Sequence, residues 1–360
     1  MRWVFVVGVL ALLCGAIAFP DEPQILTVRY RSPLLSAFWG QRVSIDATVL
    51  LPDSYYKEPQ RRYPVIYWFT GFDGSDYVGL QRELEWQRPM RHDGFEAIVV
   101  FPNIMFNGRA QEFADSANDG PWGAAFTSGF VPETDTHFRT VGTPQERFLA
   151  GISSGGWASL WLQVNYPALF GGVWSVAPDP VDFQNFLGAD LTQDPRNLYT
   201  DSSGNPYMTE RRRGHDTMTL RDFMSLVRWA RPQFDSFDEV FGPRGGDGKP
   251  EPLFDRRTGR IDPAVAAYWE AHYDIASILR DRWSAIGPQL HEKLHIIVGT
   301  EDTFHLNESV ALLAAELKAL GSDAEVDFAP GADHFTVMNW NGGLVPYMLA
   351  EIQTLEQAQH

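Results

Sequence analysis

The chain is nearly devoid of cysteine. Cys14 is the only cysteine among its 360 residues. The rest of the chain can therefore form no disulfide, supply no thiol nucleophile and hold no metal through thiolates. Basic residues are also scarce, with 29 Lys and Arg against 46 Asp and Glu and a formal net charge of −17. A chain this acidic is a poor partner for nucleic acid or for an anionic membrane.

Long apolar runs are missing everywhere except at the start. Residues 1–18 combine Arg2, an apolar stretch over Trp3–Leu13 and a small-residue site at Ala16–Ala18, which is the pattern of a cleaved secretory signal peptide. A membrane anchor is the alternative, but a span needs at least about 17 apolar residues and no stop-transfer charge follows. The sequence thus predicts export to the periplasm or the cell exterior, no stable membrane span, and one domain over 19–360.

Short apolar runs alternate with helical patterns in that domain. The runs are typical of strands buried on both faces of a sheet, and the two segments before them are typical of an antiparallel hairpin or edge. This order predicts an α/β fold, in which helices cover both faces of a mostly parallel central sheet with antiparallel N-terminal strands. The expected strands are Ile25–Arg31, Val43–Leu51, Val65–Phe69, Ala97–Phe101, Arg147–Ala150, Val173–Val176, Leu294–Val298 and Ala324–Phe328.

Apolar residues at helical spacing follow several of these strands. Residues 157–164 place their apolar side chains on one helical face. Asn307 is a candidate N-cap for a later helix, which Gly321 would end. A C-terminal helix is expected over about 344–355.

One segment, residues 180–290, breaks the alternation. It has few strand signals, several turn-rich stretches and a helical run over 263–283. It is either a surface insertion or a cap over the active site, because loops at the carboxyl ends of parallel strands carry substrate contacts. Its aromatic residues either stack on a sugar or aryl ring or, more commonly, pack the insertion's own core. They include Tyr207, Phe223, Trp229 and Trp269.

The segment from Gly151 to Gly155 matches G-x-S-x-G. It follows a predicted strand and begins a predicted helix, the setting that lifts a serine hydroxyl above the sheet edge. This context favours Ser153 as a nucleophile over a merely structural Gly/Ser turn. Ser154 is the rival serine, but choosing it would put a non-glycine residue, Ile152, at the first position of the motif.

A nucleophilic serine needs a histidine base and a carboxylate that orients the histidine. In this fold the acid and then the histidine follow the serine, each after a strand. Asp302 and His334 occupy such positions. Glu301 is adjacent and Asp179 follows an earlier strand, so both are alternatives for the acid. His305 is close to the acid in sequence but is expected to be a loop residue.

Acyl transfer also requires two hydrogen-bond donors for the oxyanion. The backbone N–H of Ser154 is one candidate. The other is the N–H of Phe72, in the loop that follows the strand at 65–69. No stretch has the ligand spacing of a calcium loop or of a phosphate-binding loop, so the sequence predicts neither a metal nor a cofactor.

These motifs resemble the Putative esterase family, which contains esterase D, enterochelin-esterase-like and feruloyl-esterase-like enzymes. The similarity extends over about 28–348 and is densest over 113–123, over 147–183 and in the Asp302 and His334 loops. It implies an α/β-hydrolase that cleaves carboxylic esters without a cofactor. Related chains often have His-Gly where this one has Thr70-Gly71, a departure that bears on the second oxyanion donor. Carried over by position, the triad is Ser153, Asp302 and His334.

The predicted activity is therefore hydrolysis of a carboxylic ester through an acyl-enzyme intermediate. The substrate class is a small-molecule or carbohydrate-linked ester. Two alternatives stay open: an acyltransferase that uses the same triad, and a non-catalytic exported binding protein of the same fold.

Overall fold

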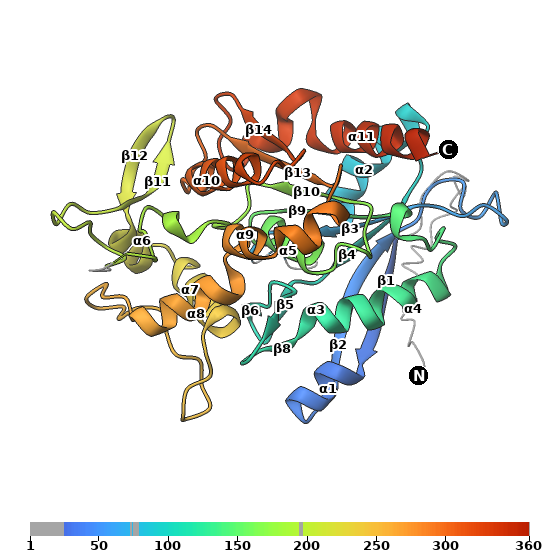
Figure 1. Ribbon diagram of the computed structural model, residues 1–360. Coiled ribbons are helices and arrows are strands. Elements are labelled where there is room, and N and C mark those ends of the chain that lie inside the picture. Colours follow the sequence, from blue (N-terminus) through green and yellow to red (C-terminus); the bar gives the residue numbers. More distant parts are fainter. Residues whose placement is uncertain (1–24, 73, 75–78, 194–196, 360) are drawn as a thin grey trace, which may run out of the picture.

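Figure 1 shows the computed structural model of the chain, which describes residues 25–72, 74, 79–193 and 197–359. The predicted signal peptide, residues 1–18, lies outside the described residues. Within the described ranges, no helix combines the length and the apolar character needed to cross a bilayer.

An eight-stranded mixed sheet forms the centre of the molecule. Its strand order is β1-β2-β4-β3-β9-β10-β13-β14. The pairs β1–β2 and β2–β4 are antiparallel and the other pairs are parallel. This arrangement confirms the predicted fold class. The strands are β1 (Ile25–Ser32), β2 (Val43–Leu50), β3 (Val65–Phe69), β4 (Ile98–Pro102), β9 (Arg147–Ile152), β10 (Gly172–Val176), β13 (Leu294–Gly299) and β14 (Glu325–Ala329).

The strand β3 shows how the sheet is covered. All five of its residues are buried. Trp68 packs edge-to-face on Trp86 of α2 (Gly79–Asp93), whereas its neighbours Tyr67 and Phe69 pack on Phe126. Because successive side chains of a strand point to opposite faces, α2 and the helical segment around Phe126 cover different faces.

The strand β10 places two more helices in the same way. Trp174 donates to Glu351 of α11 (Leu344–Gln359), whereas Ser175 donates to the Gly156 carbonyl of α5 (Ser154–Asn165). The two helices therefore lie on opposite faces, with α11 beside α2, and α9 (Ile275–Ile286) beside both α5 and α10 (Leu306–Ala319). Smaller elements complete the fold: α1 (Pro33–Trp39), β5 (Met105–Phe106), β6 (Arg109–Ala110), β7 (Asp115–Ser116), β8 (Gly120–Pro121), α3 (Trp122–Ala125) and α4 (Val131–His137).

The interrupting segment 180–290 folds as a hairpin and helices, and most of it gathers at one end of the sheet (Figure 1). The single helical run expected over 263–283 is two helices, because Asp274 leaves the helical conformation at ψ 106° and caps the second by accepting the N–H of Ser277. The elements are β11 (Met208–Arg212), β12 (His215–Thr219), α6 (Leu220–Leu226), α7 (Ala230–Phe241), α8 (Pro263–Tyr273) and α9.

Candidate active site

Ser153 occupies the turn between β9 and α5. Its φ of 59° and ψ of −126° are costly for a residue with a side chain, and its N–H is held by the Val176 carbonyl at 2.9 Å. The flanking glycines allow the close packing. A Cβ on Gly151 would lie 2.2 Å from the Gly155 oxygen, and one on Gly155 would lie 2.2 Å from the Phe69 oxygen. The result is a sharp strand-to-helix turn that presents the serine hydroxyl at the sheet edge.

Asp302 and His334 are directly joined. Oδ2 of Asp302 lies 2.9 Å from Nδ1 of His334, and both side chains are buried. Oδ1 of Asp302 accepts the backbone N–H groups of Phe304 at 2.9 Å and Leu306 at 3.2 Å. These two bonds hold the other carboxylate oxygen toward the imidazole. The prediction that Asn307 is the N-cap of the later helix is wrong. Asn307 lies inside α10, and the Asp302 carboxylate accepts the first N–H group of that helix.

The surroundings of His334 favour its charged form. Burial lowers its pKa, but the charge and hydrogen bond of Asp302, with smaller contributions from Asp179 and Asp333, outweigh burial and raise the pKa above the ordinary 6.5. An imidazolium that forms during a reaction is therefore stabilised here.

Two residues near Asp302 in sequence are engaged elsewhere. Glu301 extends toward the β11–β12 turn, where a Cβ on Gly214 would lie 3.1 Å from its Oε2. His305 is buried, with Nδ1 at 2.8 Å from Nη2 of Arg211 and 2.9 Å from Oε1 of Glu308. These contacts give Glu301 and His305 positions distinct from the Asp302–His334 pair.

Asp179, the alternative acid, makes its hydrogen bonds with groups other than His334. Its Oδ2 accepts the Ser154 hydroxyl at 2.6 Å and lies 3.5 Å from Nε2 of Gln233, while its Oδ1 lies 3.5 Å from Oγ of Ser153. Ser154 is also the first residue of α5, so its backbone N–H is among those that a helix N-terminus leaves unpaired.

The loop after β3 lies against the serine turn. A Cβ on Gly71 would be 3.2 Å from Cβ of Ser153. The Thr70 hydroxyl donates to the Gly74 carbonyl at 2.9 Å and closes the loop. Phe72, which follows Gly71 in this loop, is half-buried and lines the cavity that the next paragraph describes. Thr70 thus holds the shape of this loop.

Ser153, His334 and Asp179 line one cavity of about 570 Å³. A cavity of this size suits a small-molecule ligand. One side is built from the sheet edge and the other from the 180–290 segment, whose side chains there are mostly apolar. The contributions from that segment are Pro180, Leu187, Thr209, Phe223, Trp229, Gln233, Phe234 and Phe237.

Of the four aromatic residues named in the 180–290 segment, two line the cavity and two do not. Phe223 and Trp229 line the cavity and contact each other edge-to-face at 5.1 Å. Trp269 is fully buried among other rings of the segment, and Tyr207 packs partly buried against the core. Only the first two are placed to touch a ligand in this cavity.

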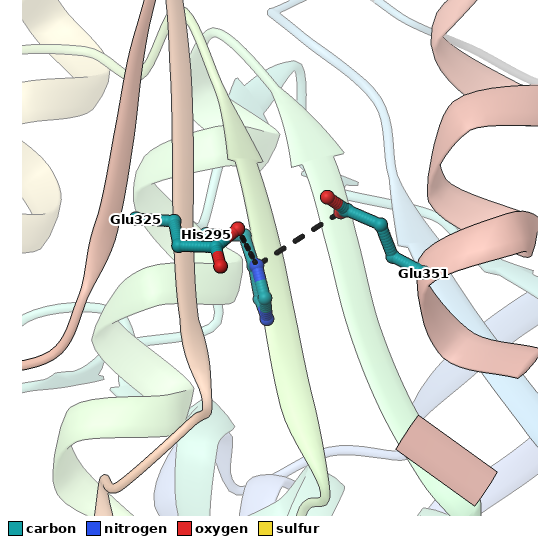
Figure 2. A group of neighbouring side chains, drawn as sticks. All are labelled: His295, Glu325 and Glu351. Atoms are coloured by element: carbon teal, nitrogen blue, oxygen red, sulfur yellow. Dashed lines mark hydrogen bonds and ion pairs between the residues drawn. The ribbon is translucent and has the colours of Figure 1, made fainter. Parts of the chain in front are cut away.

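A histidine and two carboxylates could hold a metal in another part of the described structure (Figure 2). Nδ1 of His295 lies 3.3 Å from Oε2 of Glu325 and 3.9 Å from Oε2 of Glu351. The indole N–H of Trp174 donates to Glu351, and its ring stacks on His295 with centroids 4.5 Å apart. These contacts account for the cluster as an ion-pair group that ties β14 and α11 to β13. No local spacing signals it, because its members are far apart in the sequence.

The mixed sheet and the sharp strand-to-helix turn at Ser153 are those of the α/β-hydrolase fold. The sequence model of the Putative esterase family matches residues 42–342, so the chain belongs to that family.

Part of the chain is similar in sequence to two mycobacterial esterases. Two proteins of Mycobacterium tuberculosis, Esterase Rv1288 and Esterase MT1326, are each 28% identical over 156 residues, which is 41% of this chain and 30% of theirs. The match thus spans under a third of their length.

Three solved structures share the fold at low sequence identity. A ferulic acid esterase has a TM-score of 0.56 at 15% identity, covering 93% of this chain and 97% of that one. An S-formylglutathione hydrolase from Agrobacterium tumefaciens has a TM-score of 0.52 at 14% identity, covering 94% and 95%. The fluorophosphonate-binding serine hydrolase FphF of Staphylococcus aureus also has a TM-score of 0.52 at 14%, covering 93% and 98%.

Proposed function

We propose that this chain hydrolyses carboxylic esters in two steps, with Ser153 as nucleophile, His334 as general base and Asp302 as the acid that orients it. The observation that carries the proposal is the Asp302–His334 hydrogen bond beside a strained serine turn that lines the same cavity. His334 takes the proton of Ser153, and Ser153 attacks the acyl carbon. His334 then protonates the leaving alcohol and activates the water that releases the acid.

The oxyanion that forms on the acyl oxygen needs donors that are already in place. We assign them to the backbone N–H groups of Phe72 and Ser154. The approach of Gly71 to Ser153 and the Thr70–Gly74 hydrogen bond support the first. The position of Ser154 at the start of α5 supports the second, because the helix dipole favours negative charge there.

The pH dependence follows from the role of His334. Because neutral His334 must accept the serine proton, kcat/KM for a small activated ester such as 4-nitrophenyl acetate should rise with pH through one ionisation. Its midpoint should lie above the ordinary 6.5, since the pKa of His334 is raised. A pH–rate profile that falls over this range would contradict the assignment.

We further propose that residues 180–290 act as a cap that sets ester choice, in keeping with the wall of Phe223 and Trp229 beside the catalytic groups. Trp229 also packs edge-to-face on Phe304. The ring of Phe304 in turn contacts the His334 ring, with centroids 4.8 Å apart. An acyl or alcohol group with an aryl or sugar ring could stack on these aromatic side chains.

Trp229→Ala tests the cap. It should lower kcat/KM for an aryl ester such as methyl ferulate by about 2- to 10-fold, which corresponds to the free energy that one aromatic contact contributes. The loss of kcat/KM on 4-nitrophenyl acetate should be smaller. Leu226→Ala is a matched control, since Leu226 is an exposed apolar residue of α6 at 73% accessibility. Equal losses on both esters would show that Trp229 does not select substrate.

We also propose that the enzyme acts outside the cytoplasm, because residues 1–18 have the signal-peptide pattern. N-terminal sequencing of protein isolated from the periplasm or the medium should begin at Phe19. An uncleaved N-terminus would contradict this proposal.

A further inference from the structure

The cavity has a buried carboxylate that the proposed mechanism does not use. Asp179 is 5% exposed and lines the cavity. Its Oδ2 is satisfied by the Ser154 hydroxyl at 2.6 Å, but its Oδ1 has only the Ser153 hydroxyl, at 3.5 Å. That separation is long for an O–H···O bond. Among the described residues, Oδ1 thus has no close donor, and a buried carboxylate oxygen in that state is costly.

A second buried carboxyl group, that of Glu112, interacts electrostatically with Asp179. Burial, together with the nearby Asp179 charge, raises the pKa of Glu112 well above its usual range, and the Ser154 side chain opposes this only in part. Burial also raises the pKa of Asp179, and the side chains of Ser154, Gln233 and Ser153 and the charge of His334 offset this only in part. The negative charge of Asp179 therefore disfavours the ionisation of Glu112. The carboxyl group that lines the cavity is that of Asp179, and its hydrogen bonds with Ser154 and Gln233 and the charge of His334 favour its carboxylate form.

We infer that Asp179 accepts a hydrogen bond from a hydroxyl or amino group that the substrate carries one or two carbons from its ester bond. This inference rests on the proposed function. The distance sets the position of the group: in the reaction Ser153 Oγ bonds to the acyl carbon, and Oδ1 lies 3.5 Å from Oγ. A donor two to four bonds from the acyl carbon can reach Oδ1, whereas a hydroxyl on the far side of an aryl ring cannot.

Such a group would be selected strongly. The cavity wall around Asp179 is mostly apolar, so an ester without the donor leaves the carboxylate oxygen unpaired. Sites built to pair with a substrate hydroxyl discriminate sharply against analogues that lack it. The donor can sit on the acyl part, as in a hydroxy acid, or on the alcohol part, as in the monoester of a diol or sugar.

Matched esters test the inference on the full-length enzyme. The acyl arm compares 4-nitrophenyl esters of 3-hydroxybutyrate, 3-methoxybutyrate and butyrate. The alcohol arm compares butyrate esters of ethylene glycol, 2-methoxyethanol and propanol. In one arm kcat/KM should favour the hydroxyl compound over both others by about 10- to 100-fold, as expected for a hydrogen bond to a charged group. No hydroxyl preference in either arm would overturn the inference.

Asp179→Asn should remove that preference. The Ser154 hydroxyl would bind the amide oxygen, which leaves the amide NH2 group in the place of Oδ1, where it donates rather than accepts. The methoxy ester should then be cleaved at least as well as the hydroxy ester. Asp46→Asn makes the same charge change on β2, where Asp46 forms an exposed ion pair with Arg29 of β1, and should keep the preference. A retained preference in Asp179→Asn would refute the assignment.

The two proposals fail in different ways. If the wild type cleaves 4-nitrophenyl butyrate but shows no hydroxyl preference, only the role of Asp179 is wrong. If it cleaves none of the esters in either arm, the proposed hydrolysis is wrong and the role of Asp179 falls with it.

Discussion

Ser153→Ala should abolish ester hydrolysis and leave the fold intact. Loss of a triad serine costs on the order of 10⁶-fold in kcat, and the remainder comes from binding and the oxyanion donors. Alanine occupies less space than serine, and the φ of 59° is already borne by a residue with a side chain. Hydrolysis of 4-nitrophenyl acetate and labelling by a fluorophosphonate probe measure the loss, and circular dichroism monitors the fold.

Two other serines of α5 serve as comparisons. Ser159 is buried, and its hydroxyl donates within the helix to the Gly156 carbonyl at 2.9 Å, so Ser159→Ala should remain active and labelled. Ser154 is the rival nucleophile in the motif. If Ser153→Ala were still labelled and Ser154→Ala were not, the nucleophile would be Ser154.

The central sheet was predictable because its signal is local. The residues VIYWF of β3 are apolar without interruption, and all five are buried, as expected for a parallel strand covered on both faces. The G-x-S-x-G motif is local as a sequence pattern, although some of the contacts that require its glycines are not: a Cβ on Gly155 would lie 2.2 Å from the Phe69 oxygen of β3. For these segments the local sequence was enough to predict the conformation.

Other features depend on contacts between distant segments. Asn307 has the chemistry of an N-cap, yet Asp302 satisfies the first N–H of α10 because its carboxylate is held there to face His334. The electrostatic interaction of Glu112 with Asp179 joins residues that belong to different loops. No period or spacing in the sequence brings these two carboxyl groups together, so the sequence did not predict their interaction.

Asp302→Asn should lower kcat by about 10⁴-fold, the cost of removing a triad carboxylate. The geometry gives the reason. The N–H groups of Phe304 and Leu306 would bind the amide oxygen in the place of Oδ1, which turns the amide NH2 group toward Nδ1 of His334. Nδ1 must then accept, so the ring proton moves to Nε2, and the histidine can no longer take a proton from Ser153.

A pH–rate profile and two matched variants distinguish this role from a general loss of charge. Burial lowers the pKa of His334 and Asp302 raises it, so the residual activity of Asp302→Asn should have its midpoint at lower pH than the wild type. Glu301→Gln removes the adjacent carboxylate, which extends toward Gly214, and should change kcat little. Asp179→Asn should cost far less than Asp302→Asn on 4-nitrophenyl acetate, because Asp179 makes its hydrogen bonds with groups other than the imidazole. If Asp179→Asn were the severe variant and Asp302→Asn the mild one, the acid that orients His334 would follow β10 rather than β13.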